Sequence, residues 1–137
     1  MTTTTPERVG LEIHELKSWP SSFFAVRDET KTAEFRRNDR DFQAGDLILL
    51  REFIPSKEMW LTAGLSETAW TDCWWIEYDF PKDIKEGTDA YYEAGVEKPV
   101  EAHYTGESLL VRIEHVQTGF GIPDGFVMLS IRKIKLT

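Results

Sequence analysis

A chain of 137 residues with 41% hydrophobic side chains is long enough for one domain with a buried core, and its composition excludes a disordered protein. Its formal net charge of −8 argues against a uniformly basic surface, and a single cysteine, Cys73, excludes an intrachain disulfide. No apolar run reaches the ~18 residues that span a bilayer, and no signal-peptide pattern opens the chain. We therefore expect a cytoplasmic protein without a membrane partner.

The first predicted elements are a strand and a short helix, after a flexible tail over residues 1–10. Apolar and polar side chains alternate over residues 11–17, which is typical of a half-buried strand. Trp19-Pro20 then predicts a helix start, since proline suits the first helical turn and a neighbouring serine can cap it. We expect this helix to end near residues 28–30.

A second strand is predicted over residues 32–36. The period of two places Thr32, Glu34 and Arg36 on one face of this strand. Ala33 and Phe35 are then expected to face the core.

The remaining strands are predicted at 47–53, 108–116 and 125–131. The nearly continuous apolar run 47–53 follows a turn and predicts a central strand, and the other two alternate. Strands with few helices and no βαβ alternation favour an α+β fold, a small mixed β-barrel with one or two helices.

Residues 55–103 form a long acidic segment within this predicted single domain. The segment holds four lysines against eleven aspartates and glutamates, a net charge of −7, together with four of the five tryptophans. Alternation over residues 74–80 predicts one extra strand there. Exposed tryptophan and tyrosine make good anchors for a protein partner, whereas the structural alternative is that they pack as additional core.

A locally basic stretch precedes the acidic segment. Residues 31–40 carry four cationic side chains against two acidic ones, a net charge of +2 in a chain that is acidic overall. This mixture of charged, amide and aromatic side chains exceeds what packing requires. The candidate site is therefore sought here and in the strand and helix before it.

Several motifs in a fixed order resemble those of the ASCH superfamily. They are His14-Glu15-Leu16-Lys17, Trp19-Pro20, Lys31-Thr32-x-Glu34-x-Arg36-x-Asn38-Asp39-Arg40-Asp41-Phe42, Gly45-Asp46, and the closing segments that begin at Tyr104-Thr105-Gly106 and Gly121-Ile122-Pro123-Asp124-Gly125. Within the superfamily the chain is similar to a small ASCH-like family of unknown function from bacteria and their phages. The resemblance covers about residues 11–54 and 104–132, and it implies a PUA-like β-barrel in which 55–103 is an insertion.

ASCH domains are thought to bind RNA or modified nucleotides in a cleft beside the first helix, so the resemblance implies an RNA or nucleotide-like ligand. One similar bacterial branch is an amidohydrolase of acetylcytidine that uses a lysine, a threonine nucleophile three residues later and a later glutamate. Here the lysine position falls on Lys31, but the nucleophile position holds Glu34, which cannot replace a hydroxyl. We expect binding rather than catalysis; Lys31, Thr32 and Glu34 are the catalytic candidates if the protein is an enzyme.

The candidate ligand-binding set combines charged, amide and aromatic side chains. Lysine and arginine suit phosphate or carbonyl oxygens, and a glutamate suits an exocyclic amine. The structural alternatives are a salt-bridge ladder, a packed tryptophan, a structural histidine and a self-capped turn. The set is His14, Lys17, Trp19, Lys31, Thr32, Glu34, Arg36 and Asn38.

Three hypotheses for function follow. The first is an RNA- or nucleotide-binding protein, the second is the amidohydrolase, and the third is a phage-encoded interaction protein that acts through 55–103. His103, His115 and Cys73 lack metal-ligand spacing, so we expect no metal and no cofactor.

Overall fold

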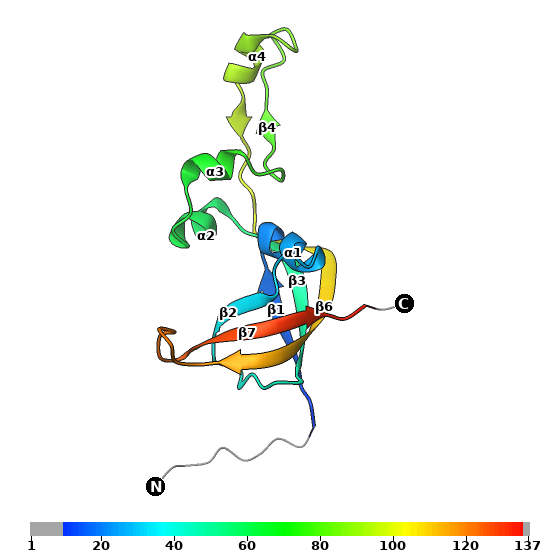
Figure 1. The fold of residues 1–137 in the computed structure, drawn as a ribbon. Coiled ribbons are helices and arrows are strands. Elements are labelled where there is room, and N and C mark those ends of the chain that lie inside the picture. Colours follow the sequence, from blue (N-terminus) through cyan, green and yellow to red (C-terminus); the bar gives the residue numbers. More distant parts are fainter. Residues whose placement is uncertain (1–9, 136–137) are drawn as a thin grey trace. The chain divides into compact units, whose positions relative to one another are not determined.

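The computed structural model describes residues 10–135 and contains two compact units. Unit 1 combines the chain up to Phe53 with the chain from Tyr104 onward, and unit 2 is Ile54–His103. The tail predicted over residues 1–10 lies outside the described residues except for Gly10. The elements are β1 (Ile13–Ser18), α1 (Pro20–Arg27), β2 (Ala33–Arg37), β3 (Leu47–Ile54), α2 (Lys57–Thr62), α3 (Glu67–Thr71), β4 (Tyr78–Asp79), α4 (Asp89–Glu93), β5 (Val96–Glu97), β6 (His103–Gln117) and β7 (Phe126–Lys133) (Figure 1).

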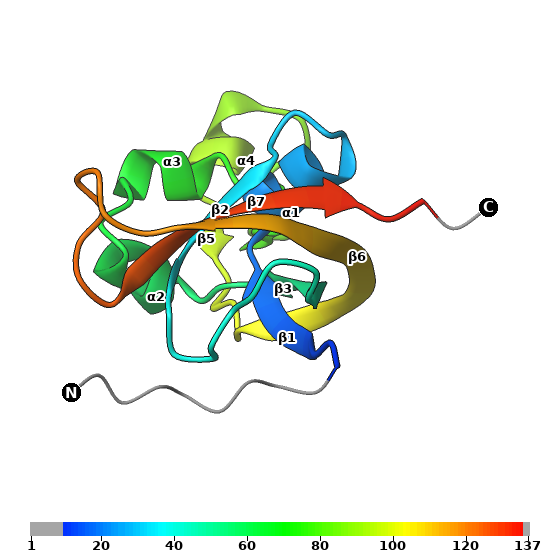
Figure 2. The ribbon, with the colours of Figure 1, turned by 60° about the horizontal axis from the view of Figure 1, so that its bottom comes forward.

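Unit 1 is a mixed α+β structure whose sheet curls into a half-barrel. The five strands follow the order β1-β3-β6-β7-β2, so β1 and β2 are the two end strands. β1 runs parallel to β3, whereas β7 runs antiparallel to both β6 and β2. The pairing of β6 shifts register between Ile113 and His115, and such a bulge increases the local bend of a strand. Figure 2 shows β6 curving through the sheet.

Alternation along the strands builds the core of unit 1 on the inner face of the curl. In β1 every second residue is buried, and the same period applies to β7 and to β3 as far as Glu52, after which Phe53 and Ile54 are buried as well. Helix α1 adds Val26, which is 2% exposed. The core cluster comprises Leu16, Val26, Phe42, Ile48, Leu50, Val111, Ile113, Val127, Leu129 and Ile131. The predicted α+β class and the five predicted strand positions are confirmed, although β6, not β3, lies in the middle of the order.

Helix α1 begins as predicted, at Pro20, but without a serine cap. Trp19 is the N-cap residue and makes no side-chain capping bond, while the fixed φ of proline suits the first turn. The helix ends at Arg27, where the backbone N–H of Asp28 donates to the carbonyl oxygen of Phe24. The helix is therefore held at its start by backbone geometry, with no serine capping bond.

The predicted orientation of β2 is wrong. Phe35 is 48% exposed and faces away from the core, whereas Glu34 is 4% exposed and faces inward. Ala33 is half-buried and shares the outward face with Phe35. The face of β2 that carries Glu34 and Arg36 lines the polar end of the curl, so charge pairing, rather than burial of Phe35, sets the direction of this strand.

Unit 2 has an aromatic core of its own. The rings of Trp60, Trp70 and Trp75 lie 5.8–6.2 Å apart, and Trp70 is fully buried. The strand predicted over residues 74–80 is wrong in extent, because only Tyr78–Asp79 pairs, with Val96–Glu97. Trp74 and Tyr92 remain 63% and 61% exposed. Among residues 10–135, no helix has the length and apolar character that crossing a membrane requires.

Replacing residues 55–103 with a short glycine-containing turn should leave the sheet of unit 1 folded. β3 and β6 are neighbours in the sheet, and the rings of Phe53 and Tyr104, at the two ends of the replaced segment, lie 5.0 Å apart. A short turn can therefore join them. Circular dichroism should retain the strand signal, and thermal unfolding should remain a single cooperative transition. A chain that fails to fold would show that unit 2 is part of one domain with the sheet.

Candidate functional site

The candidate site centres on the carboxylate of Glu34. Lys31 Nζ donates to Glu34 Oε1 at 3.0 Å, and Arg36 Nε donates to Oε2 at 3.2 Å. The Glu34 side chain is 5% exposed, whereas those of Lys31 and Arg36 are 36% and 27% exposed. A buried carboxylate thus fixes two partly exposed cations, and the cluster carries a net positive charge at the surface. The cluster of Lys31, Glu34 and Arg36, with Ser22 described next, is called the Glu34 cluster.

Ser22, on helix α1, completes this cluster and was missed at the level of sequence. Lys31 Nζ donates to Ser22 Oγ at 2.6 Å, and the same hydroxyl lies 3.5 Å from Glu34 Oε1. The spacing of residues along the predicted helix could have identified Ser22. Ser22 is four residues before Val26 and so shares its inward-facing side of the helix.

Two arginines connect the end strands of the sheet. Arg36 Nη2 donates to the carbonyl oxygen of Lys17 at 2.8 Å, and Arg40 Nη1 donates to the carbonyl oxygen of Glu15. Residues two apart on a strand direct their backbone groups to the same edge, so both carbonyls lie on the edge of β1 that faces away from β3. These bonds hold β2 and the residues after it against β1 and position Arg36 beside the cluster.

The side chain of Lys17 lies on the outer face of β1, away from the Glu34 cluster. Its Nζ is 4.5 Å from the ring centroid of Phe53 and 5.9 Å from that of Tyr104. The Arg51 guanidinium lies 3.8 Å from the same Tyr104 centroid. These are cation–π contacts on a partly exposed surface. Lys17 therefore contributes its backbone oxygen, not its ammonium group, to the candidate site.

Two buried polar atoms beside the cluster have no hydrogen-bond partner among residues 10–135. Ser18 and Glu52 are register partners in β1 and β3 and are 2% and 3% exposed. Thr105 Oγ1 donates to Glu52 Oε1 at 2.8 Å, while Glu52 Oε2 and Ser18 Oγ are unpartnered. Such atoms are costly unless a water or a ligand group bonds to them. The polar inner face thus extends from the Glu34 cluster past the Lys17–Ser18 peptide to Glu52.

His14 belongs to a different network. It is 5% exposed, its Nε2 lies 2.9 Å from Asp46 Oδ2, and its ring meets the ring of Phe42 edge-on at 4.7 Å. The Asp46 carboxylate also accepts the backbone N–H groups of Glu12 and Gln43. Four residues of extended chain, about 13 Å, separate His14 from Ser18. The structure therefore places His14 at the other end of the inner face, where it orders the turn before β3.

The remaining predicted residues flank the Glu34 cluster. Trp19 is half-buried at the start of α1. Thr32 precedes β2, is exposed, and accepts the N–H of Ile131 on its carbonyl oxygen at 2.9 Å. Asn38 is exposed, and its Oδ1 accepts the N–H of Phe42 at 3.3 Å. Thr32 thus has a backbone role in the sheet, and Asn38 caps the turn that follows β2.

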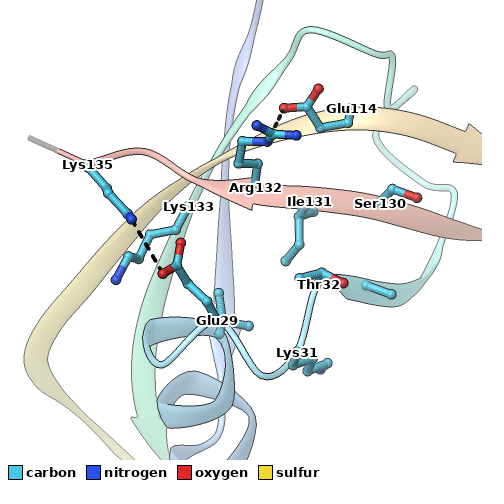
Figure 3. Close-up of a pocket in the computed structure, with 11 residues that line it drawn as sticks. Glu29, Lys31, Thr32, Glu114, Ser130, Ile131, Arg132, Lys133 and Lys135 are labelled. Carbon is cyan, nitrogen blue, oxygen red and sulfur yellow. Dashed lines mark ion pairs between the residues drawn. The ribbon is translucent and has the colours of Figure 1, made fainter.

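A groove of about 820 Å³ lies between the α1–β2 loop and the end of β7 (Figure 3). Arg132 pairs with Glu114 at 3.2 Å, Lys135 pairs with Glu29 at 3.6 Å, and Lys133 Nζ donates to the Arg27 carbonyl oxygen at 2.7 Å. Figure 3 shows the pair of Glu29 and Lys135 and the pair of Glu114 and Arg132 as separate parts of the lining. Lys31 and Thr32 also line this groove, whose charged lining residues are four cations and two carboxylates.

No group of three or more histidine, cysteine, aspartate or glutamate side chains that could hold a metal ion occurs between residues 10 and 135. His103 and His115 are exposed and bond to Glu101 and Gln117. Partial burial, with a smaller contribution from Asp72, raises the pKa of the Cys73 thiol. A raised pKa lowers the thiolate fraction near neutral pH, so Cys73 is a poor nucleophile.

Comparison with known proteins gives two similarities. A family described as a domain of unknown function (DUF3850) matches residues 13–70. The chain is also 40% identical over 43 residues to an uncharacterized 12.9 kDa protein in the GpA 3′ region of Escherichia phage P2. That alignment covers 31% of this chain and 39% of the phage protein, well under half of its length. Neither description names an activity.

The family match covers the part of the chain that contains the Glu34 cluster. It begins at the start of β1 and ends in α3, so it includes α1, β2 and β3, while β6 and β7 lie beyond it. The chain is therefore similar to a family of unknown function in the elements that supply Ser22, Lys31, Glu34 and Arg36.

His14→Ala should destabilise the protein without changing its affinity for a ligand. The substitution leaves the buried Asp46 carboxylate without its histidine partner, and loss of a buried hydrogen bond to a charged group costs about 1.5–3 kcal/mol. Urea denaturation should show the lower free energy of unfolding, while nucleotide titrations at a temperature where the variant is folded should match the wild type. Weakened binding by the folded variant would restore His14 to the ligand site.

Proposed function

We propose that this protein is an ASCH-type, PUA-like barrel of the cytoplasm that binds RNA or a nucleotide-like ligand at the Glu34 cluster. The observation that supports this most is the pair of partly exposed cations held by one buried carboxylate. Arg36 has Nε bonded to Glu34 and Nη2 bonded to the Lys17 carbonyl, so its guanidinium plane is fixed. Fixed donors lose less conformational entropy when they bind a phosphate or carbonyl oxygen.

The polar inner face beside the cluster supports the same proposal. Glu52 Oε2 and Ser18 Oγ are buried without partners among the described residues, and a base with N–H donors and ring acceptors can bond to both once the side chains that cover them move. The cations would then hold phosphate or sugar oxygens while the inner face contacts the base. His14 and the Lys17 ammonium lie outside this arrangement.

Lys31→Ala and Arg36→Ala should each weaken binding of RNA or a nucleotide on the order of tenfold, because each removes charge-assisted hydrogen bonds to the ligand. The slope of log affinity against log salt should fall by about one for each RNA phosphate that the variant no longer binds. Fluorescence anisotropy with labelled RNA across a salt series measures both quantities. Lys82→Ala removes the same charge from an exposed position in unit 2 and serves as the matched control.

The free energy of unfolding provides the check on this prediction. Because the buried Glu34 carboxylate keeps one of its two cations in each variant, each substitution should cost about 1.5–3 kcal/mol and leave the fold intact. Unchanged binding by both folded variants would show that the Glu34 cluster is a structural ion-pair network.

The amidohydrolase is the second candidate, and one contact favours it. Ser22 Oγ lies 2.6 Å from Lys31 Nζ, so a hydroxyl and an amine are adjacent although the nucleophile position holds Glu34. The same Lys31 Nζ also donates to Glu34 Oε1 at 3.0 Å, so the amine is already engaged by a carboxylate. Ser22, rather than the exposed Thr32, would supply the nucleophile in this mechanism.

Incubation with acetylcytidine should yield little or no cytidine above the background, measured by mass spectrometry. Any turnover that does occur should disappear in Ser22→Ala and persist in Thr32→Ala, because only Ser22 bonds to Lys31. Robust turnover that depends on Thr32 would contradict this assignment and favour the enzyme hypothesis based on Thr32.

The third candidate, protein interaction through residues 55–103, is supported by the exposed Trp74 and Tyr92 in a segment with a net charge of −7. An acidic surface speeds association with a basic partner at low salt. The variant without residues 55–103 should then lose such a partner and bind RNA more tightly, since the chain would lose most of its negative charge.

A further inference from the structure

The outward face of β2 and β7 presents two aromatic rings to solvent. Phe35 and Phe126 are stacked with their planes 4° apart and their centroids 5.2 Å apart. Phe35 is 48% exposed, and Phe126 is half-buried. The inward face of the same strands holds Val127, Leu129 and Ile131, so the core does not need these rings. Exposed, stacked rings of this kind mark a binding surface.

The charges on this face are mainly positive. Arg37, the register partner of Phe126, has its guanidinium carbon 5.4 Å from the Phe126 ring centroid. At the other end of β7, Arg132 is the register partner of Arg112 on β6. Arg37 and Arg112 make no ion pair within residues 10–135, while Arg132 pairs with Glu114. The face therefore attracts anions in a chain with a net charge of −8.

The outward face that carries the aromatic rings leads along β2 and β7 to the groove described above. Ala33 and Ser130 are register partners and both line the groove, where Figure 3 labels Ser130. Phe35 with Met128 is the next outward pair along the same strands. From Phe126 to Arg132 the strand advances about 20 Å. This length accommodates the two or three bases that aromatic sheet faces stack in RNA-binding proteins.

The turn between β6 and β7 places a third aromatic ring at the same end of the sheet. Phe120 is 96% exposed and has a φ of 51°, in the left-handed region that bulky residues avoid. Its neighbours Gly119 and Gly121 both have positive φ as well. A turn that holds a bulky ring in solvent at a conformational cost is a further indication that the ring has a partner.

We propose that the outer face of β2, β7 and β6 binds single-stranded nucleic acid, with bases stacked on Phe35 and Phe126. Arg37 and the Arg112–Arg132 end of the face would contact the phosphates. Stacking on aromatic rings tolerates any base, because every base has a π-face. A second copy of this chain fits less well, because symmetric pairing of this face would bring Arg37 and Arg112 of the two copies together. Phe35 and Phe126 lie on the opposite side of the sheet from Glu34 and Arg36, while Lys31 of the Glu34 cluster lines the groove at the far end of this surface. Stacking of bases on the two rings does not require the cluster.

The test compares oligonucleotides with single nucleotides on folded variants. Phe35→Ala should weaken binding of a labelled single-stranded dodecamer on the order of tenfold, since one stacking ring is lost. It should leave binding of a mononucleotide unchanged. Phe35→Leu keeps an apolar side chain but no aromatic ring and should weaken the dodecamer similarly. Tyr92→Ala removes an exposed aromatic ring from unit 2 and serves as the matched control.

Abasic substitution separates base stacking from charge. A dodecamer whose central nucleotides lack bases keeps its phosphates, so it should bind the wild type more weakly than the intact strand. Phe35→Ala should bind the intact and abasic strands with nearly equal affinity, because the ring that reads the bases is absent. Arg36→Ala, which belongs to the Glu34 cluster and does not line the groove, reports on the cluster separately, through the mononucleotide.

Three outcomes would overturn the proposal. The first is unchanged dodecamer affinity in both Phe35 variants. The second is equal affinity of the wild type for the intact and abasic strands. The third is a wild-type dimer in sedimentation analysis that Phe35→Ala dissociates, which would assign the rings to self-association.

Discussion

The buried carboxylate of Glu34, paired with both Lys31 and Arg36, is the feature on which the direction of β2 in unit 1 depends. The curled sheet ends in β1 on one side and β2 on the other, and these two strands are not hydrogen-bonded neighbours. Side-chain contacts join them instead. Glu34 fixes Arg36, and Arg36 bonds to the Lys17 carbonyl oxygen on the open edge of β1. Because of the same contact, the charged side chains of β2 point into the curl and Phe35 points to solvent. The buried Glu34 carboxylate thus shapes both the inner polar face and the outer aromatic face.

Much of the fold follows from alternation and turn chemistry in the sequence. The period of two in residues 11–17 and 108–116, and the apolar run at 47–53, give the strands because each has a face that must be buried. The helix was located by Trp19-Pro20, since proline both fits and starts a helix. These features are local, so sequence reasoning reaches them. The assignment of the whole chain to one domain remains a prediction.

Tertiary interactions outweigh the local pattern in the segments where the predictions were wrong. The alternation in residues 33–37 does not by itself show which face of the strand is inward. The rule that apolar side chains are buried therefore led to the prediction that Phe35 faces the core. That rule does not hold where the inner face is itself polar, as it is beside Ser18 and Glu52. Residues 74–80 alternate like a strand, but aromatic packing and a two-residue pairing determine their structure. Ser22 was missed because its role depends on Lys31, nine residues away.

The point at which the chain leaves the sheet has an evolutionary consequence. Phe53 and Tyr104 lie in ring contact on neighbouring strands, so the two ends of residues 54–103 meet at one place. The entropy of closing a loop between two adjacent points grows only with the logarithm of its length. Recombination that exchanged this segment for a longer or shorter one would leave strand register, core and the Glu34 cluster untouched. The junction is therefore a position at which a gene can acquire a new appendage in a single step.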